Sequence, residues 1–342
     1  MIKIPNIRGL KKTYNLFRTT SQIQGPGIDQ KLIDQMMYSF ETLPPLGKEY
    51  WWLLFFGNEG PKPIQLMLMI CRKYGKKMWI DNTEMTLKDL GKDGIKSAIT
   101  GWLYDGTKMI NLGDTNAVVK IADKKILTEI AGNELIFEGS FPYYKLKIGN
   151  IVDLNISHEN TLVKRNKEAY GVFWPPFGTG YFNLYPDVSG IIFGKTFQGT
   201  GHLQKVVGIS PHFPYNWARM IFKNGAMLRF SHIKPGKIQI ERSIEFYDNN
   251  ENKIIKFNKP SLKISQSDDY LIWTLEGQDK DNYAKVVLEA YAKKKFVMKG
   301  GGTLTYVEYC VVPKELILKL KEKTITLNDL GDGVGTLEDA YW

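Results

Sequence analysis

The 342-residue sequence predicts an all-β protein of antiparallel sheets that form barrels or sandwiches, with a short helix toward each end. Three observations predict this class. Short runs of alternating apolar and polar residues dominate the chain, and Asn-Gly, Asp-Gly, Gly-Gly and Asn-Asn pairs separate them. Helical patterns are few. Hydrophobic residues make up 43% of the chain and aromatic residues 13%, which supplies a sizeable core and argues against disorder.

The two helical patterns lie toward the ends of the chain. Residues 29–41 (DQKLIDQMMYSFE) predict an N-terminal helix. Residues 313–323 (PKELILKLKEK) begin with a proline, which suits the first turn of a helix, and continue with apolar residues near helical spacing. We expect this second segment to be a terminal helix that covers an open barrel end.

Strand patterns make up most of the chain between these helices. Residues 151–157 (IVDLNIS) place Val152, Leu154 and Ile156 on one face and polar residues on the other. The same alternation continues in four later segments: 238–248 (IQIERSIEFYD), 270–277 (YLIWTLEG), 282–292 (NYAKVVLEAYA) and 302–312 (GTLTYVEYCVV).

The clearest local signal is a hairpin over residues 217–232 (WARMIFKNGAMLRFSH). Asn224-Gly225 favours a two-residue type I′ turn, which places Lys223 opposite Ala226. That register predicts one face made of Trp217, Arg219, Ile221, Leu228, Phe230 and His232. A face with these residue types suits a ligand cavity. The alternative is that Arg219 stacks on an aromatic ring and His232 caps the strand end.

Composition changes near residue 210, where GISPHFPYN contains two prolines and other turn formers. We therefore expect an N-terminal domain over residues 1–210 and a C-terminal domain over residues 211–342, in keeping with the chain length. The two cysteines, Cys71 and Cys310, are far apart in sequence, so neither a disulfide framework nor a metal site is implied.

The net charge of +10 favours an anionic partner such as a membrane surface, nucleic acid or an acidic substrate, but the lysines are scattered, and solubility is the preferred explanation. No RNA-recognition signature or basic-aromatic stripe is present. The N-terminal residues do not resemble a signal peptide, and no apolar run approaches the roughly 20 residues that span a bilayer. We expect a cytoplasmic protein, with peripheral contact to an anionic membrane as an alternative. The low number of Cys and His suits a thermophile.

A Gly- and aromatic-rich region, residues 171–208, contains the strongest candidates for a site. Alternation over residues 200–207 places His202 and Gln204 on one side and Lys205 on the other, outward or against the second domain. His202 could transfer a proton near neutral pH, and Gln204 could orient a polar group. Trp174, Tyr181 and Tyr185 supply rigid apolar surface for a flat or polyene ligand. The alternative is ordinary core packing with a buried polar pair at a domain interface.

Segment 302–312 places Tyr306 and Glu308 on one face between apolar neighbours. A carboxylate buried there without a partner would be costly. We therefore expect Glu308 to reach solvent or to pair with an arginine, for which Arg219, Arg229 and Arg242 are the candidates.

Several segments resemble the carotenoid 1,2-hydratase (hydroxyneurosporene synthase) and AttH-like double-lipocalin family. EYWWLLFFG (49–57), with Trp51 and Trp52, resembles the EWWY motif that opens the first domain, and residues 180–208 resemble its closing segment. The hairpin from Trp217 resembles the opening of the second domain, and YVEYC (306–310) its Glu-bearing last strand. The resemblance covers most of the chain. It implies two lipocalin-like barrels packed together and ligands of isoprenoid or polyketide type.

Two departures bear on the reaction. Tyr50 stands where the family motif has Glu, although Glu49 is adjacent. Aligned on Gly208, Gln204 and Lys205 occupy the positions of the Asp-His pair of the hydratases. Hydration of an isolated double bond needs a strong proton donor, which Gln is not and which Lys becomes only with a pKa lowered by several units. The departures therefore argue against the hydratase reaction.

Three functional hypotheses follow. The first is an enzyme without cofactor or metal that cyclises, isomerises or hydrates an isoprenoid- or carotenoid-like molecule in a barrel cavity; no nucleotide-binding, nucleophile-elbow or metal motif is present. The second is a carrier of the same ligands. The third is a protein that binds nucleic acid or an anionic membrane. The predicted catalytic residues are His202, Glu308 and Gln204, and the predicted ligand-binding residues are Trp51, Trp52, Trp174, Tyr181, Tyr185, Trp217, Arg219, Phe230, His232 and Tyr306.

Overall fold

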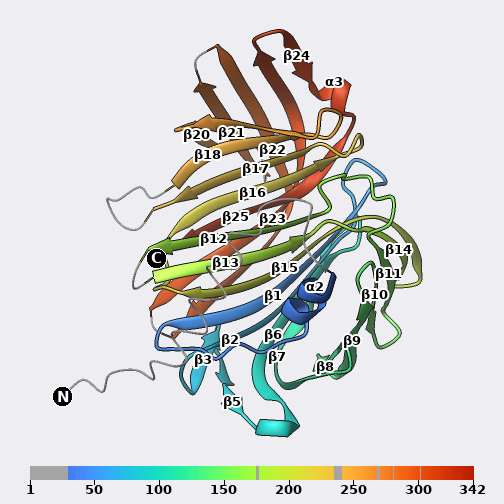
Figure 1. The fold of residues 1–342 in the computed structure, drawn as a ribbon, viewed down its shortest axis with the longest axis vertical. Helices are drawn as coiled ribbons and strands as arrows, with labels where there is room; N and C mark the ends of the chain where they lie inside the picture. Colours follow the sequence, from blue (N-terminus) through green and yellow to red (C-terminus); the bar gives the residue numbers. More distant parts are fainter. Residues whose placement is uncertain (1–29, 175–176, 235–240, 268–269, 280, 301) are drawn as a thin grey trace, which may run out of the picture.

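The structure, a computed structural model, describes residues 30–342 except 175–176, 235–240, 268–269, 280 and 301. Strands account for nearly all of its regular structure, so the all-β prediction is confirmed. The helical elements are α2 (Gln30–Met37), the 3₁₀ turn η1 (Gly91–Asp93) and α3 (Leu327–Leu330). Figure 1 shows two antiparallel sheets, one from each half of the chain, that lie against each other.

The first sheet closes into a barrel. Ten strands form the ring, which is completed where β15 pairs with β1 along its length, and the β12–β13 hairpin extends from the other edge of β15. The strands are β1 (Gly47–Gly57), β2 (Gln65–Lys73), β5 (Lys88–Asp89), β6 (Ile95–Tyr104), β7 (Met109–Ala122), β8 (Lys125–Ile130), β9 (Asn133–Ser140), β10 (Tyr143–Ile148), β11 (Val152–Ser157), β12 (Lys167–Trp174), β13 (Phe177–Leu184), β14 (Asp187–Ile192) and β15 (Lys195–Ile209).

The second sheet is a long curved layer in the order β19-β18-β17-β16-β25-β23-β22-β21-β20. The β3–β4 hairpin of the N-terminal half joins it by pairing with β22, so the two halves of the chain are interlocked. The strands are β3 (Lys77–Ile80), β4 (Thr83–Thr86), β16 (Tyr215–Phe222), β17 (Met227–Ile233), β18 (Glu241–Asp248), β19 (Lys253–Asn258), β20 (Ser261–Ser267), β21 (Tyr270–Asp279), β22 (Asn282–Lys299), β23 (Thr303–Leu320), β24 (Lys323–Thr326) and β25 (Gly333–Tyr341). The boundary expected at residue 210 falls between β15 and β16 and remains a prediction.

A seam joins the two sheets, and we use this name for the buried layer between β1, β12, β13 and β15 on one side and β16, β23 and β25 on the other. Strand β1 contributes to both the barrel core and the seam because both of its faces are apolar. Trp51, Leu53 and Phe55 point into the core of the barrel, whereas Trp52 and Leu54 belong to the seam cluster with second-sheet residues. One apolar face of the WWLLFF segment therefore packs inside the barrel, and the other packs against the second sheet.

The β16–β17 hairpin differs from the predicted one by one residue in register. Phe222 pairs with Ala226 across a three-residue loop, and Gly225 alone adopts a positive φ, of 81°. This is a turn followed by a glycine bulge, whereas a type I′ turn needs positive φ at two positions. A shift of one residue in register moves every side chain of a strand to the other face of the sheet. Leu228, Phe230 and His232 therefore lie on the opposite face from Arg219. The predicted single face is wrong.

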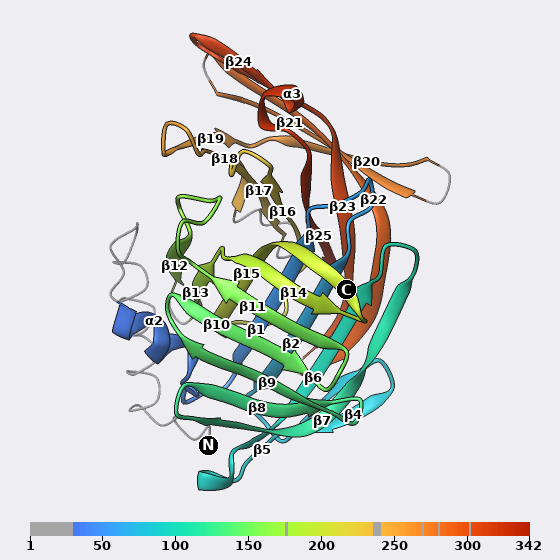
Figure 2. The same cartoon turned by 90° about the vertical axis from the view of Figure 1, so that its right-hand side faces the viewer.

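The two helix predictions had different outcomes. Helix α2 confirms the N-terminal prediction and lies against one end of the barrel, where Ile33, Met36 and Met37 enter the core (Figure 2). The helix predicted at 313–323 is wrong, because β23 continues as a strand to Leu320. Its apolar residues also fit a period of two, and pairing with the 18-residue strand β22 decides between the two periods. Pro313 is tolerated because the register shifts beside it.

Helix α2 is anchored by Asp34, which gives a stability prediction. Its buried carboxylate accepts hydrogen bonds from Ser140 Oγ, Phe141 N and Tyr144 Oη and pairs with Lys124. Burial raises the pKa of Asp34, but these partners outweigh burial and lower it. We expect Asp34→Ala to reduce the free energy of unfolding by about 2 to 3 kcal/mol in urea titrations.

The control for this variant is Asp153→Ala, which breaks an exposed ion pair with Lys145 and should cost less than about 1 kcal/mol. Equal losses in the two variants would contradict the anchoring role of Asp34.

Candidate functional site in the seam

The seam face of the second sheet carries a polar row between aromatic residues. Strands β16, β25 and β23 lie side by side, and their register places Trp217 opposite Glu338 and Glu338 opposite Glu308. The adjacent row places Arg219 opposite Thr336. Because residues directly opposite share a face, all five side chains point toward the barrel.

The barrel contributes Glu168 of β12 to this seam, and Arg219 pairs with it at 3.3 Å. Glu168 also accepts hydrogen bonds from Asn183 Nδ2 (2.9 Å) and Tyr185 Oη (2.6 Å). Burial alone would raise the pKa of Glu168, but Arg219 and Arg229, with these hydrogen bonds, lower it well below its ordinary value. A satisfied ion pair therefore ties the two sheets together at this end.

His202 lies at the centre of the same end of the seam. Its ring is fully buried and lies between Tyr185 (ring centroids 5.2 Å apart) and Trp217 (5.7 Å) in near-parallel stacks. Burial and the charge of Arg219 lower the pKa of His202 well below its ordinary value. His202 is thus neutral at pH 7. With Gln204 it faces the second sheet, whereas Lys205 points into the end of the barrel, which corrects the expected direction of Lys205.

The seam also contains two opposed carboxyl groups, Glu308 and Glu338, next to Trp217. Glu308 is fully buried, and it accepts hydrogen bonds from Tyr306 Oη (2.7 Å) and Thr336 Oγ1 (2.5 Å). Glu338, which keeps part of its surface exposed, accepts one from Tyr215 Oη (2.8 Å). Within the described residues neither carboxyl forms an ion pair, so the predicted pairing of Glu308 with an arginine is wrong; Arg219 is already paired with Glu168.

Burial raises the pKa of both carboxyl groups. The pKa of Glu308 lies well above its ordinary value because of burial and the neighbouring Glu338, against the hydrogen bonds from Thr336 and Tyr306. The pKa of Glu338 is raised to about 7, mainly by burial. Two carboxyls without a cation retain protons into the neutral range. The pair is therefore a proton source inside an aromatic environment: Trp52, Tyr215 and Phe296 all lie within 6.4 Å of the Tyr306 ring.

The structure brings most of the predicted site residues together. Trp52, Tyr306 and Glu308 lie at or beside the carboxyl pair. The adjoining group, in which Gln204 is in register with Trp52 and Trp217 with Glu338, consists of His202, Gln204, Tyr185, Trp217 and Arg219. Half-buried Tyr181 lies on β13 in register with Val206. The side chain of Trp174 lies outside the described residues.

Three predicted residues lie away from the seam. Trp51 faces the barrel core, where Lys205 Nζ lies 3.7 Å from its ring centroid. Phe230 lies in the core of the second sheet, and its ring is 6.4 Å from that of His232. Burial, with Lys234 and Arg242, lowers the pKa of His232 to about 4.

Sequence reasoning missed Glu168, Asn183, Tyr215 and Glu338. For two of them, the alternation of residues in the sequence indicated which face of the strand they occupy. Asn183 alternates with Tyr181 and Tyr185, so it shares their face, and Glu338 alternates with Thr336. Glu168 and Tyr215 carried no such signal, because the contacts that place them in the seam, Glu168 with Arg219 and Tyr215 with Glu338, join residues 51 and 123 positions apart.

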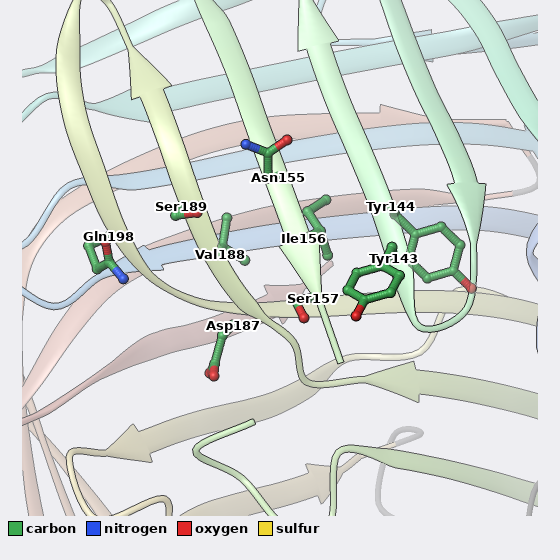
Figure 3. A pocket seen from close by; sticks show the side chains of 9 residues that line it. All are labelled: Tyr143, Tyr144, Asn155, Ile156, Ser157, Asp187, Val188, Ser189 and Gln198. Carbon is green, nitrogen blue, oxygen red and sulfur yellow. The ribbon is translucent and has the colours of Figure 1, made fainter. Parts of the chain in front are cut away.

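A shallow hollow of about 340 Å³ lies on the outer wall of the barrel, across β10, β11, β14 and β15 (Figure 3). It is lined by Tyr143, Tyr144, Asn155, Ile156, Ser157, Asp187, Val188, Ser189 and Gln198. None of these residues belongs to the predicted site. In the part of the chain that the structure describes, no group of three or more His, Cys, Asp and Glu could hold a metal ion.

The closed barrel, the curved second sheet and the polar seam between them define a double-sheet protein of lipocalin-like architecture. The chain shares this fold with a crystal structure of a protein provisionally assigned as AttH from Nitrosomonas europaea, at 12% identity over 92% of this chain and 96% of that chain, with a TM-score of 0.51. The fold implied by the AttH resemblance is thus confirmed.

Two further solved structures are similar over most of the chain. One is CghA (9% identity, 93% of this chain and 94% of that chain, TM-score 0.49), and the other is kievitone hydratase from Nectria haematococca (10% identity, 85% and 88%, TM-score 0.46). No protein-family model and no curated protein matches the chain. Among the described helices, none has the length and apolar character needed to cross a membrane.

Proposed function

We propose that the protein is an acid–base enzyme that binds an apolar, isoprenoid-like small molecule in the seam and protonates it with the Glu308–Glu338 pair. The observation that carries the proposal is the opposition of two carboxyls, Glu308 fully buried and Glu338 partly exposed, which form no ion pair within the described residues and accept hydrogen bonds from hydroxyl groups. A carboxylic acid with a pKa near the working pH is an efficient general acid. The pair supplies the proton that Gln204 and Lys205 cannot.

The chemistry follows from the surroundings of the pair. The partly exposed carboxyl of Glu338 donates its proton to a carbon of the substrate double bond, which leaves a carboxylate and a carbocation. The faces of Trp52, Tyr215 and Tyr306 stabilise the cation. The carboxylate then removes a proton from a neighbouring carbon, which completes an isomerisation or cyclisation, or from a water molecule that attacks the cation, which completes a hydration. Glu308, whose pKa is raised by burial and by Glu338, keeps its own proton and limits the charge of the pair.

Access to the pair is available from one side. Four side chains on this side keep part of their surface exposed: Tyr50, Tyr215, Trp217 and Glu338. Glu308 and Tyr306 are buried behind them. The charges of Tyr50, Tyr215 and Glu338 also affect one another's pKa values, which places these groups close together. A ligand that approaches from this edge meets Glu338 first.

The test begins with the ligand that co-purifies with the full-length protein, identified by native mass spectrometry and lipid extraction. The purified protein is then incubated with this ligand in D₂O. We expect deuterium in recovered ligand or product, and Glu338→Gln should reduce the rate of incorporation by at least about 100-fold while ligand binding persists. Glu315→Gln, which changes an exposed ion pair, should have no effect.

Two results would contradict enzymatic function. Ligand recovered unlabelled and unchanged from the native protein would identify a carrier. Equal incorporation in the native protein and in Glu338→Gln would remove the carboxyl pair from the mechanism.

A further inference from the structure

Three buried nitrogens in the seam have no protein hydrogen-bond partner among the described residues. They are Nδ1 of His202, Nε of Arg219 and Nε1 of Trp52, on side chains that are 0%, 4% and 6% exposed. Native proteins pair nearly all of their buried polar atoms with protein groups, ordered water or a ligand, so these three nitrogens need partners from outside the described chain. The carboxyl pair does not account for them.

These nitrogens belong to one cluster. Trp52 pairs with Gln204 in the β1–β15 register, so it shares the seam face with His202, two residues along β15. The Arg219 guanidinium lies 5.0 Å from the centroid of Tyr185 and 5.7 Å from that of Trp217, the two rings that enclose His202.

The hydrogen-bond network determines which His202 nitrogen carries the proton. Asn183 donates from Nδ2 to the Glu168 carboxylate, which orients its amide. Its Oδ1 must then accept, and it does so from Gln204 Nε2 (2.8 Å) and from His202 Nε2 (3.3 Å). Nε2 therefore carries the hydrogen, and Nδ1 of the neutral ring presents a lone pair. A ligand must donate a hydrogen bond to Nδ1.

The other two nitrogens require a partner that accepts a hydrogen bond. Nε of Arg219 and Nε1 of Trp52 are donors only, so their partner must accept. The charge of Arg219 is already balanced by Glu168, and a further buried negative charge would be unpaired. A neutral carbonyl oxygen therefore suits this position better than a carboxylate.

We propose that this cluster is a binding subsite for a neutral hydroxy ketone: the hydroxyl donates to His202 Nδ1, and the carbonyl oxygen accepts from Arg219 Nε and Trp52 Nε1. The subsite rests on the proposed ligand-binding function of the seam, and it names the polar end of the ligand whose apolar part reaches the carboxyl pair. Trp217 connects the two regions because it stacks on His202 and lies directly opposite Glu338. It is also the only partly exposed ring of the Tyr185–His202–Trp217 stack, so the ligand enters past it.

The test measures calorimetric binding of three probes to the full-length protein: 4-hydroxynonan-2-one, nonan-2-one, which lacks the hydroxyl, and nonan-4-ol, which lacks the carbonyl. We expect the hydroxy ketone to bind at least about tenfold more tightly than either analogue, because each analogue leaves a buried protein group unpaired. His202→Phe keeps the aromatic stack and should abolish the advantage over nonan-2-one. Arg219→Lys keeps the pairing charge and should reduce the advantage over nonan-4-ol.

Two control variants separate this subsite from other effects. His158→Phe changes another buried, ring-stacked histidine in the barrel wall and should leave all three affinities unchanged. Glu338→Gln should retain the preference for the hydroxy ketone even where it abolishes deuterium incorporation, so that failure of the catalytic proposal is distinguished from failure of the subsite. Equal affinities for the three probes, no binding of any probe, or an intact preference in His202→Phe would overturn the assignment.

Discussion

Replacing Glu49 by Gln is expected to lower the free energy of unfolding by about 3 to 5 kcal/mol. Glu49 is fully buried at the end of the barrel, where it pairs with Lys205 Nζ at 2.9 Å and Arg72 at 2.6 Å. Lys205 is only 3% exposed, and burial lowers its pKa even though Glu49 raises it. Without the carboxylate, two cations share one desolvated position. Urea unfolding followed by tryptophan fluorescence measures the loss.

The double variant Glu49→Gln/Lys205→Met provides the matched comparison. It removes the uncompensated charge, and we expect it to recover part of the lost stability, since an apolar replacement of a buried ion pair is often tolerated. Glu138→Gln, in a largely exposed pair with Lys125, should cost less than about 1 kcal/mol. A loss below about 1 kcal/mol in Glu49→Gln would show that the ion pairs of Glu49 with Arg72 and Lys205 do not stabilise this end of the barrel.

The Glu308–Glu338 pair is expected to contribute stability that is lost as the pH rises from about 5 to 8, because the pair is protonated in the folded protein. For Glu338, a pKa raised from the ordinary 4.5 to about 7 corresponds to a contribution on the order of 3 kcal/mol. This contribution to stability is fully present below pH 4.5, the ordinary pKa of Glu338 in the unfolded chain. It is lost as the pH rises through about 7, the pKa of Glu338 in the folded protein. Glu308, whose pKa is also raised, acts in the same direction.

The measurement compares the free energy of unfolding of the native protein and Glu338→Gln at intervals between pH 5 and pH 8. Gln is neutral throughout and still accepts the hydrogen bond from Tyr215, so the difference in free energy of unfolding between the variant and the native protein should shift in favour of the variant as the pH rises from 5 to 8. Groups with lowered pKa values act in the opposite sense, Asp34 mainly below this window and His158, His202 and His232 within it. They cancel in this comparison because both proteins contain them. Parallel profiles would show that Glu338 ionises normally.

The strand content could be predicted from the sequence because period-two alternation is a local property. Segment 151–157 shows this, since Val152, Leu154 and Ile156 are all buried in β11 as expected. The same reasoning placed His202 and Gln204 together on one face and Lys205 on the other. It could not establish which of these faces points into the barrel, because both faces of β15 are buried.

The hairpin error has a physical reason that lies elsewhere in the chain. The backbone N–H groups of Lys223 and Asn224 donate to Asp332 O and Leu330 O, and Asn249 donates to the carbonyl of Asn224. These contacts select a three-residue loop over the two-residue turn that Asn-Gly favours in isolation. Local turn chemistry indicated a hairpin at this position, and tertiary contacts determined its register.

The sequence by itself determined the fold class, most of the strands and the aromatic and polar residues from which a site could be built, because alternation and turn residues act over a few neighbours. Only the tertiary structure placed Glu308 opposite Glu338, paired Arg219 with Glu168 and enclosed His202 between two rings. Each of these contacts joins residues at least 15 positions apart in sequence, and the protonation of the groups involved depends on burial and neighbouring charges. Those quantities exist only once the two sheets have packed together.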